Sequence, residues 1–375
     1  MKFGKFADIS YLGSADIIGT ALSSVFWIIL ASQISPDEYG EIFYFIGIAK
    51  MATAFILIGT QNTITVYSSK KFQLESTLYF ISLVASVVAS FVLMILFYRV
   101  DVIFLIFGFV INSLAMGELL GNKNFKLYSI HTFIQKILLI SVGLLFLYFF
   151  GEDAIIFVVA GSYLFFSVVI INRFRKTKIN FSLLKNHGKF ILNNYIIEVI
   201  AKSNSNLRIF IIVQLLGFTV LGNFSLAIQI ISIGLVFSII IFKYTIPYDS
   251  RGQENKKLNK ISILISIIMV LLGVFVAPLI IPIFFQEYVE VIDLIRIVSF
   301  SIIPMSITKI YTSKLLGQEQ SKQLVFSKII SISSFIILII ILAPVYGIIG
   351  VGIGYLVSTI LETICLIPKN QIIKN

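Results

Sequence analysis

One polar stripe on an otherwise apolar segment holds the residues best suited to bind a charged ligand. Asn194, Glu198, Lys202, Ser205 and Arg208 fall within an arc of about 120° when this segment is drawn as a helix at about 100° per residue. Two cations on one face suit an anion, and Arg can bind phosphate through two parallel hydrogen bonds. We therefore expect Asn194, Lys202, Ser205 and Arg208 to bind substrate, with Glu198 as an ion-coupling residue or a counter-ion. The alternative is that Glu198 and Lys202 neutralise each other at i,i+4, while Arg208 extends toward the membrane surface.

A carboxylate in the first apolar segment is the second candidate. Asp16 lies on a stripe with Thr20, Ser23 and Trp27. It could bind H⁺ or Na⁺, because burial favours the protonated form of a carboxylate. It could equally be a counter-ion for a buried Lys, or a hydrated group near the cytoplasmic surface. The sequence predicts no other cofactor and no metal site, because two histidines and one cysteine are too few for a metal cluster.

Cations outnumber acids inside the apolar segments. A charge at the centre of a bilayer costs about 2.5–3.5 kcal/mol on insertion scales, so such residues are functional candidates. Lys50 and Lys309 are hard to explain otherwise and are expected to bind substrate, whereas Lys136 could extend to the cytoplasmic surface. A net cationic interior suits an anionic substrate, phosphate in particular. The embedded cations are Lys50, Lys136, Lys202, Arg208, Arg296, Lys309 and Lys328, against Asp16, Glu198, Asp293 and Glu362.

The elements that position these residues are membrane-spanning helices. The chain is 58% hydrophobic, has a mean hydropathy of +1.02, and is only 13% charged, against about 25% in soluble domains. A span needs about 20 apolar residues. Twelve candidates lie near 11–32, 41–65, 77–98, 102–121, 130–150, 154–172, 190–216, 220–242, 259–285, 291–313, 324–343 and 346–368.

The distribution of charge orients these spans. Most of the 29 Lys and Arg residues fall at every second junction, and cytoplasmic loops retain such cations. Both termini are therefore expected in the cytoplasm, which requires an even number of crossings. The net charge of +11 is then a topology signal and a contact with anionic membrane lipids, and no nucleic acid partner is expected.

The sequence indicates an all-α polytopic membrane protein of two six-helix lobes. The expected division is a lobe at 1–172, a basic cytoplasmic linker at 173–189 and a second lobe at 190–375. Traces of duplication support it: Asp16 and Gly40 are separated by the same interval as Glu198 and Gly222. Two lobes with an even number of spans enter from the same side, as in transporters built from parallel repeats.

The sequence favours transport over catalysis. It contains no G-x-x-x-x-G-K-[ST] phosphate loop and suggests no Ser–His–Asp arrangement. The outer loops are also too short to form a large catalytic face, so the protein is not expected to be an enzyme.

Three turns resemble those of a known family. Gln33-Ile34-Ser35-Pro36-Asp37-Glu38-Tyr39-Gly40 is similar to the "L-[SG]-P-x-[ED]-Y-G" turn of Wzx-type polysaccharide-biosynthesis flippases, in the multidrug/oligosaccharidyl-lipid/polysaccharide (MOP) exporter superfamily. Val220-Leu221-Gly222-Asn223-Phe224 resembles the family's "V-G-x-[YF]" turn, and Pro344–Gly350 its penultimate turn.

This resemblance implies a function. It predicts a flippase that moves an undecaprenyl-pyrophosphate-linked oligosaccharide from the inner to the outer leaflet of the bacterial inner membrane by alternating access. Surface polysaccharide, O-antigen or capsule, would be the product, and other glycan-assembly membrane proteins would be possible partners. The family's cationic cavity corresponds by role to Lys50, Lys202, Arg208 and Lys309. The alternative is a proton- or sodium-coupled multidrug exporter of the same superfamily, with Asp16 as the coupling site.

Overall fold

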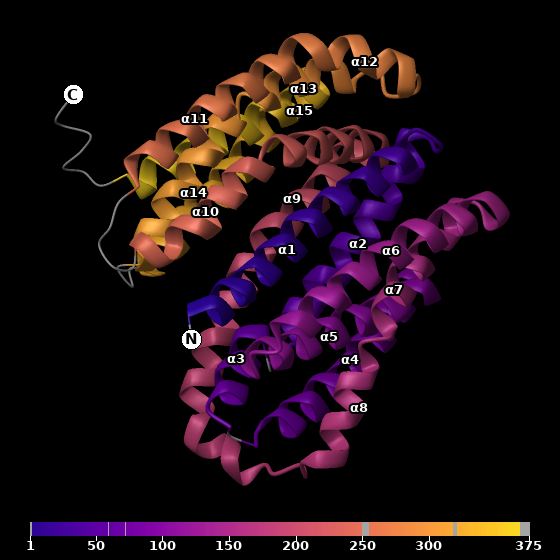
Figure 1. Cartoon of the computed structure of the whole chain (residues 1–375). Helices are drawn as coiled ribbons and strands as arrows, with labels where there is room; N and C mark the ends of the chain where they lie inside the picture. The colour runs from indigo at the N-terminus through magenta and orange to yellow at the C-terminus, as the bar shows by residue number, and fades with distance from the viewer. Residues whose placement is uncertain (1, 59, 72, 250–254, 318–320, 368–375) are drawn as a thin grey trace. The chain divides into compact units, whose positions relative to one another are not determined.

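The structure is a computed structural model, and it describes residues 2–367 apart from 59, 72, 250–254 and 318–320. Some side chains within helices lie outside the described part, among them those of Asp16, Asn194 and Ser205. The described residues form helices joined by short turns, and they contain no strand (Figure 1). This agrees with the all-α class predicted from the long apolar segments, because lipid-exposed backbone must satisfy its own hydrogen bonds.

The first half of the chain forms helices that match the first six predicted spans. The second span is interrupted after Ile56, and Thr60 caps the helix that resumes it by accepting a hydrogen bond from the Thr63 amide at 3.2 Å. The helices are α1 (Lys2–Ala31), α2 (Pro36–Ile56), α3 (Gln61–Ser69), α4 (Glu75–Phe97), α5 (Val100–Gly121), α6 (Phe125–Phe150), the 3₁₀ turn η1 (Glu152–Ala154), α7 (Ile155–Leu164) and α8 (Ser167–Lys176).

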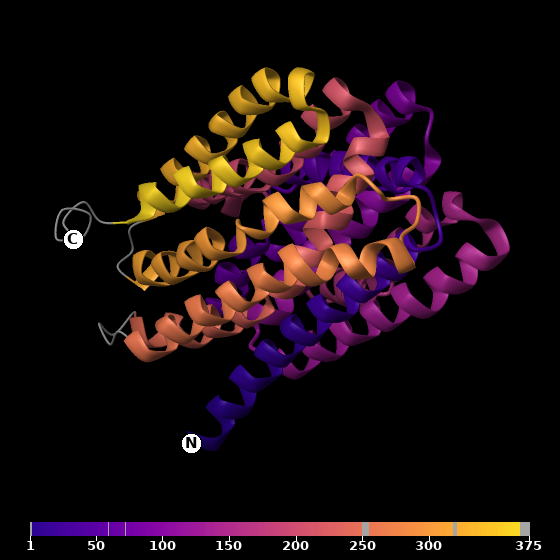
Figure 2. The ribbon, with the colours of Figure 1, turned by 90° about the horizontal axis from the view of Figure 1, so that it is seen from above.

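The second half contains two helices that each reverse direction. Gly217 has φ +84° and Gly347 has φ +54°, conformations that favour glycine, and each ends one crossing and starts the next. Figure 2 shows the two parts of the last helix side by side. The helices are α9 (Ser182–Gly234), α10 (Val236–Asp249), α11 (Lys256–Leu271), the π-helical turn η2 (Leu272–Val276), α12 (Ala277–Phe284), α13 (Val291–Ser299), α14 (Ile302–Gly317) and α15 (Ser321–Leu366).

The described helices account for the twelve predicted crossings. By length and composition, eight can span a membrane, or nine when the bent pair α13 and α14 is one span. That count gives α15 one crossing, omits the first part of α9, and classes the apolar part of α1 (Ile17–Ala31) as short. Dividing α9 and α15 at their glycines and including α1 supplies the remaining three crossings.

The chain forms two compact units that differ from the expected lobes. Unit 1 contains residues 1–23 and 45–206, and unit 2 contains residues 24–44 and 207–375. The expected boundary lay at the basic linker 173–189. Residues 24–44 join unit 2 because their turn packs against the second part of α9, where the Thr219 hydroxyl donates to Asp37 Oδ1 at 2.9 Å.

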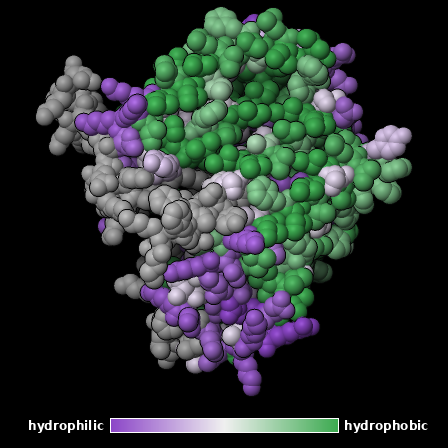
Figure 3. Space-filling view, viewed as in Figure 1, coloured by the Kyte–Doolittle hydropathy of each residue, from purple (hydrophilic) through white to green (hydrophobic). Residues whose placement is uncertain are grey.

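Unit 1 is built around α5. This helix packs against α3, α4 and α7, and Leu105, Ile106 and Leu114 on it are fully buried. The opposite face of α4 is apolar and exposed, with Phe91 65% and Val88 61% exposed, as expected for a lipid-facing helix. In Figure 3, apolar side chains cover the upper and right-hand part of the view, and hydrophilic side chains gather at its lower end, near the end of α8.

Unit 2 is built around α14, which packs against α10, α11 and α15. The ninth crossing widens into the π-helical turn η2 just before Pro278, which cannot donate the backbone hydrogen bond of a regular helix. Gly273 within this turn leaves room for Ser299 of α13, whose Oγ lies 2.1 Å from where a Cβ would be.

Candidate functional site

Unit 1 contains two lysines in membrane-spanning helices that have no acidic partner among the residues the structure describes. Lys50 of α2 is exposed, and its Nζ lies 5.9 Å from the centre of the Phe109 ring on α5. Lys136 of α6 is half-buried, and its stem packs against α1, 3.7 Å from the position a Cβ would take at Gly19. The two ammonium groups are near enough to repel each other. Among the described residues, neither forms an ion pair.

The Lys50–Lys136 pair has the chemistry of an anion site. A cation inside a membrane protein normally pairs with an acid or faces water. Here two cations of unit 1 share a region without a carboxylate within ion-pair distance in the described part of the chain. The second crossing is interrupted after Ile56, six residues beyond Lys50. An anionic ligand would relieve the repulsion between the two ammonium groups.

Lys202 and Glu198 form an i,i+4 ion pair. This pair is the alternative interpretation of the polar stripe in the sequence. Lys202 Nζ lies 2.6 Å from Glu198 Oε1, and the side chains are 35% and 13% exposed. Glu198 Oε2 is buried and accepts no hydrogen bond within the described residues. Glu198 is therefore the counter-ion of Lys202, and that cation is less available to a ligand than Lys50 is.

Arg208 is buried in unit 2 and faces protein, not lipid. Its Nη2 donates to Ser331 Oγ at 2.8 Å, and its guanidinium lies 5.0 Å from the ring centres of both Phe335 and Tyr355. Such cation–π contacts stabilise a desolvated cation. Lys202 belongs to unit 1 and Arg208 to unit 2, so the stripe predicted on one helix is divided between the units.

The remaining predicted residues lie on α14, α1 and α9. Lys309 of α14 lies in unit 2, with Nζ 5.4 Å from the Phe242 ring centre. The side chains of Asp16, Asn194 and Ser205 lie outside the described residues, although their backbones belong to α1 and α9. Their roles in ion coupling and substrate binding stay predictions.

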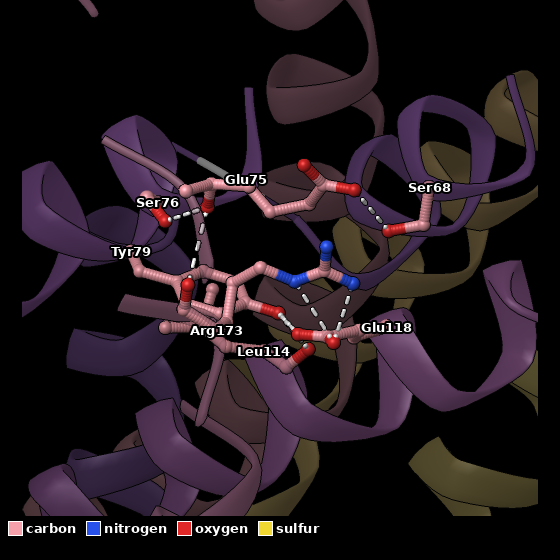
Figure 4. Close-up of polar contacts among 8 residues, drawn as sticks. Ser68, Glu75, Ser76, Tyr79, Leu114, Glu118 and Arg173 are labelled. Carbon is pink, nitrogen blue, oxygen red and sulfur yellow. Dashed lines mark hydrogen bonds and ion pairs between the residues drawn. The ribbon is translucent and has the colours of Figure 1, made fainter. Parts of the chain in front are cut away.

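A buried charged cluster in unit 1 was not predicted from the sequence (Figure 4). Arg173 of α8 donates to Glu118 Oε1 of α5 from Nε at 2.9 Å and from Nη2 at 2.6 Å. Tyr79 of α4 donates to Glu118 Oε2 at 2.6 Å. Close by, Ser68 Oγ donates to Glu75 Oε1 at 3.0 Å. Arg173 had been assigned to a basic loop, and no sequence pattern connects it with residues so far away along the chain.

Comparison with known proteins gives a fold. No protein-family model matches the chain, and no curated protein matches it. A solved inward-facing multidrug-resistance MATE-family transporter of the MOP superfamily superposes with a TM-score of 0.70 at 15% identity, over 92% of each chain. The chain has the fold of the MATE transporters. A MATE-family outward-facing structure gives a TM-score of 0.65 at 17% identity, over 95% of this chain and 93% of that one.

The chain is also similar to a MOP-superfamily transporter from Pyrococcus furiosus Vc1. It superposes with a TM-score of 0.66 at 16% identity, over 95% of this chain and 93% of that one. The binding pocket of that protein is described as having reverse polarity, which suggests a different function for it. The MATE fold has twelve helices in two lobes, as predicted for this chain.

Proposed function

We propose that this protein is an alternating-access flippase for a polyprenyl-pyrophosphate-linked oligosaccharide. The observation that carries the proposal is the pair Lys50 and Lys136, two cations in the membrane-spanning part of unit 1 with no acidic partner among the described residues. The motif resemblance to Wzx-type flippases supplies the substrate class and the bacterial inner membrane as the location. Surface polysaccharide assembly would then be the pathway the protein serves.

The diphosphate of such a substrate matches this pair. At 4 Å, in an effective dielectric of about 20, two opposite unit charges attract by about 4 kcal/mol. Two lysines can therefore offset part of the cost of moving a diphosphate out of water. Lys acts as a point charge on a flexible stem and does not demand one phosphate geometry. The pair would hold the head group while leaving the sugar and the lipid tail free to differ.

The MATE fold supports a transport mechanism. Proteins with this fold have been solved in inward-facing and outward-facing conformations, which are the two end states of alternating access. The absence of a phosphate loop for ATP hydrolysis from the sequence agrees with transport driven by substrate or ion gradients.

A multidrug exporter is the second candidate, because several proteins with this fold are described as MATE multidrug transporters. Many drugs handled by exporters are cations, and the lysine pair would repel them. The polarity of the site thus favours an anionic substrate. This candidate would require coupling through an acid such as Asp16, and Asp16→Asn should then abolish efflux.

Reconstitution tests the proposal. Purified protein in lipid vesicles is given a labelled polyprenyl-pyrophosphate saccharide, and the fraction reaching the opposite leaflet is measured over time. We expect Lys50→Ala with Lys136→Ala to reduce the rate by at least about tenfold, the equivalent of about 1.4 kcal/mol. Lys126→Ala is the matched control, because Lys126 is an exposed lysine at the start of the same helix α6.

The outcomes separate the candidates. An unchanged rate in the double variant contradicts the role of the lysine pair. Absence of saccharide movement by the wild type, together with efflux of a cationic drug that Asp16→Asn abolishes, would instead identify a multidrug exporter.

A further inference from the structure

The guanidinium of Arg173 lies between two buried carboxylates, those of Glu118 and Glu75 (Figure 4). It makes both of its short contacts with Glu118, whose second oxygen is occupied by the Tyr79 hydroxyl. Glu118 and Arg173 thus neutralise each other. The charge of Glu75 is not balanced in the same way, because no ion pair joins Glu75 to Arg173.

Glu75 carries an oxygen with no partner. The residue is only 2% exposed. Its Oε1 accepts from Ser68, whereas its Oε2 is buried and has no hydrogen-bond partner in the described part of the chain. A buried polar atom without a partner is costly, and a charged one more so.

The groups around Glu75 do not supply the missing positive charge. The charged and titratable groups that face it are Arg173 of α8, Glu118 of α5 and Tyr79 of α4. Lys70 and Lys71, in the turn between α3 and α4, are exposed, and neither forms an ion pair with it. Glu75 lies in the first turn of α4, where the helix dipole favours a negative charge, but this effect is weaker than that of a full counter-ion. Two buried carboxylates therefore lie beside one guanidinium, which forms its ion pair with Glu118.

We infer that the Glu75 carboxylate is the binding site of one small cation, either H⁺ or Na⁺, at its unpartnered Oε2. A proton would convert the carboxylate into a neutral carboxylic acid. A sodium ion would take Glu75 and Ser68 as oxygen ligands, a ligand type that hard cations prefer. This inference does not depend on the identity of the transported substrate.

Occupancy of this site would affect the connection between α8 and α4. The segment after Arg173 is fastened to α4, because Ser76 and Thr177 share a hydrogen bond and the Asn180 amide donates to Thr77 Oγ1 at 2.8 Å. When the cation leaves, an ionised Glu75 competes with Glu118 for Arg173. Cation binding is thereby linked to the position of the last turn of α8, which leads into the basic linker.

Thermal unfolding of the purified full-length protein in detergent tests the inference. One arm compares NaCl with choline chloride at equal ionic strength, and the other varies the pH from about 6 to about 8.5 in choline chloride. A cation that binds only the folded protein raises Tm with the logarithm of its concentration. We expect Tm to rise by several degrees with Na⁺ or with falling pH, and the responding arm identifies the cation.

Glu75→Gln should remove that response and hold Tm near the value of the cation-loaded wild type, because the amide is neutral. Asp153→Asn is the matched control, since Asp153 is an exposed acid of the same unit. It should keep the wild-type response. No response of the wild type in either arm, or a full response in Glu75→Gln, overturns the inference.

Ser68→Ala covers the case in which Glu75→Gln does not fold. Removing this donor to Glu75 Oε1 takes away a hydrogen bond that favours the charged form. If the cation is a proton, the midpoint of the response shifts to higher pH. If it is Na⁺, a ligand is lost and the midpoint shifts to at least about threefold higher Na⁺ concentration. An unchanged midpoint overturns the inference.

Discussion

Gly40 and Gly222 pack reciprocally, because each glycine contacts the backbone carbonyl of the residue four positions before the other glycine. A Cβ at Gly40 would lie 2.0 Å from the Phe218 oxygen, and one at Gly222 would lie 1.8 Å from the Pro36 oxygen. The two glycines therefore occupy equivalent positions in the structure. The sequence also treats them as equivalent, because Gly40 follows Asp16 at the same interval at which Gly222 follows Glu198. Both turns belong to unit 2, so this contact is internal to one compact unit.

Replacing either glycine should disrupt this contact. In Gly40→Ala or Gly222→Ala the new methyl group meets backbone, which cannot move aside as a flexible side chain can. We expect a loss of about 1–3 kcal/mol of stability, typical of an overpacked core, measured by chemical unfolding in detergent. Gly161→Ala is the control, because nothing lies within 4 Å of its Cβ position. It should be neutral or slightly stabilising. Equal effects at all three positions would contradict this account.

Arg208 and Lys50 should respond oppositely to loss of charge. Arg208→Met removes the hydrogen bond to Ser331 and the contacts with two aromatic rings, so we expect a loss of about 1–3 kcal/mol. Lys50→Met removes a cation with no ion-pair partner in the described residues and should leave stability unchanged or raise it. Thermal unfolding of the two variants measures both effects, and a loss of stability in Lys50→Met would show an acidic partner.

The pair Glu198–Lys202 should show coupling in a double-mutant cycle. Lys202→Met leaves the Glu198 carboxylate, which is mostly buried, without its cation. The double variant Lys202→Met with Glu198→Gln should be more stable than Lys202→Met alone. We expect a coupling of about 1 kcal/mol from unfolding measurements of the four proteins. A coupling near zero would return Lys202 to the residues available for a ligand.

Inorganic pyrophosphate should stabilise the folded protein through the lysine pair. The ligand binds the folded state, so Tm should rise with its concentration in the wild type. The rise should disappear in Lys50→Ala with Lys136→Ala and persist in Lys126→Ala. Added NaCl should weaken the effect, because salt screens accessible charges. A rise that survives in the double variant would place the anion elsewhere.

Tyr288 should make stability depend on alkaline pH. Tyr288 lies in the loop between α12 and α13. Its hydroxyl donates to the carbonyl oxygen of Ile34 or of Ser35, each 3.2 Å away, between α1 and α2. Burial, reinforced by the carboxylates of Glu287 and Glu38, raises the pKa of Tyr288 well above its usual value near 10. Above about pH 10 the unfolded state loses the phenolic proton while the folded state keeps it, so stability falls as pH rises.

Tyr288→Phe is the corresponding variant. It should lose about 1 kcal/mol at neutral pH together with part of the alkaline decline. Chemical unfolding at about pH 8 and about pH 10.5 measures both. An alkaline decline identical to that of the wild type would assign the effect to other tyrosines.

The sequence predicts the features that depend on local periodicity. The apolar lengths predict the twelve crossings, and the spacing of Glu198 and Lys202 predicts one possible ion pair, which the structure contains. The division into units was not predictable, because residues 24–44 join unit 2 through contacts such as Asp37 with Thr219, far apart in the chain.

The cluster around Glu118 escaped prediction for the same reason. Its partner Arg173 is separated from it by two helices, and a loop cation and a buried one look alike in a sequence. Lys136 looked like a residue that extends to the surface, and only the packing of its stem against Gly19 places it beside α1.

The reversals at Gly217 and Gly347 each need little more than one residue. At these two reversals, which lie on the side assigned to the exterior, the chain therefore offers almost no loop for a protease to cut or an antibody to recognise. An epitope tag for following the protein at the cell surface has better prospects beside Gly151 and Asp153, where α6 ends and the backbone leaves the helix before η1 begins.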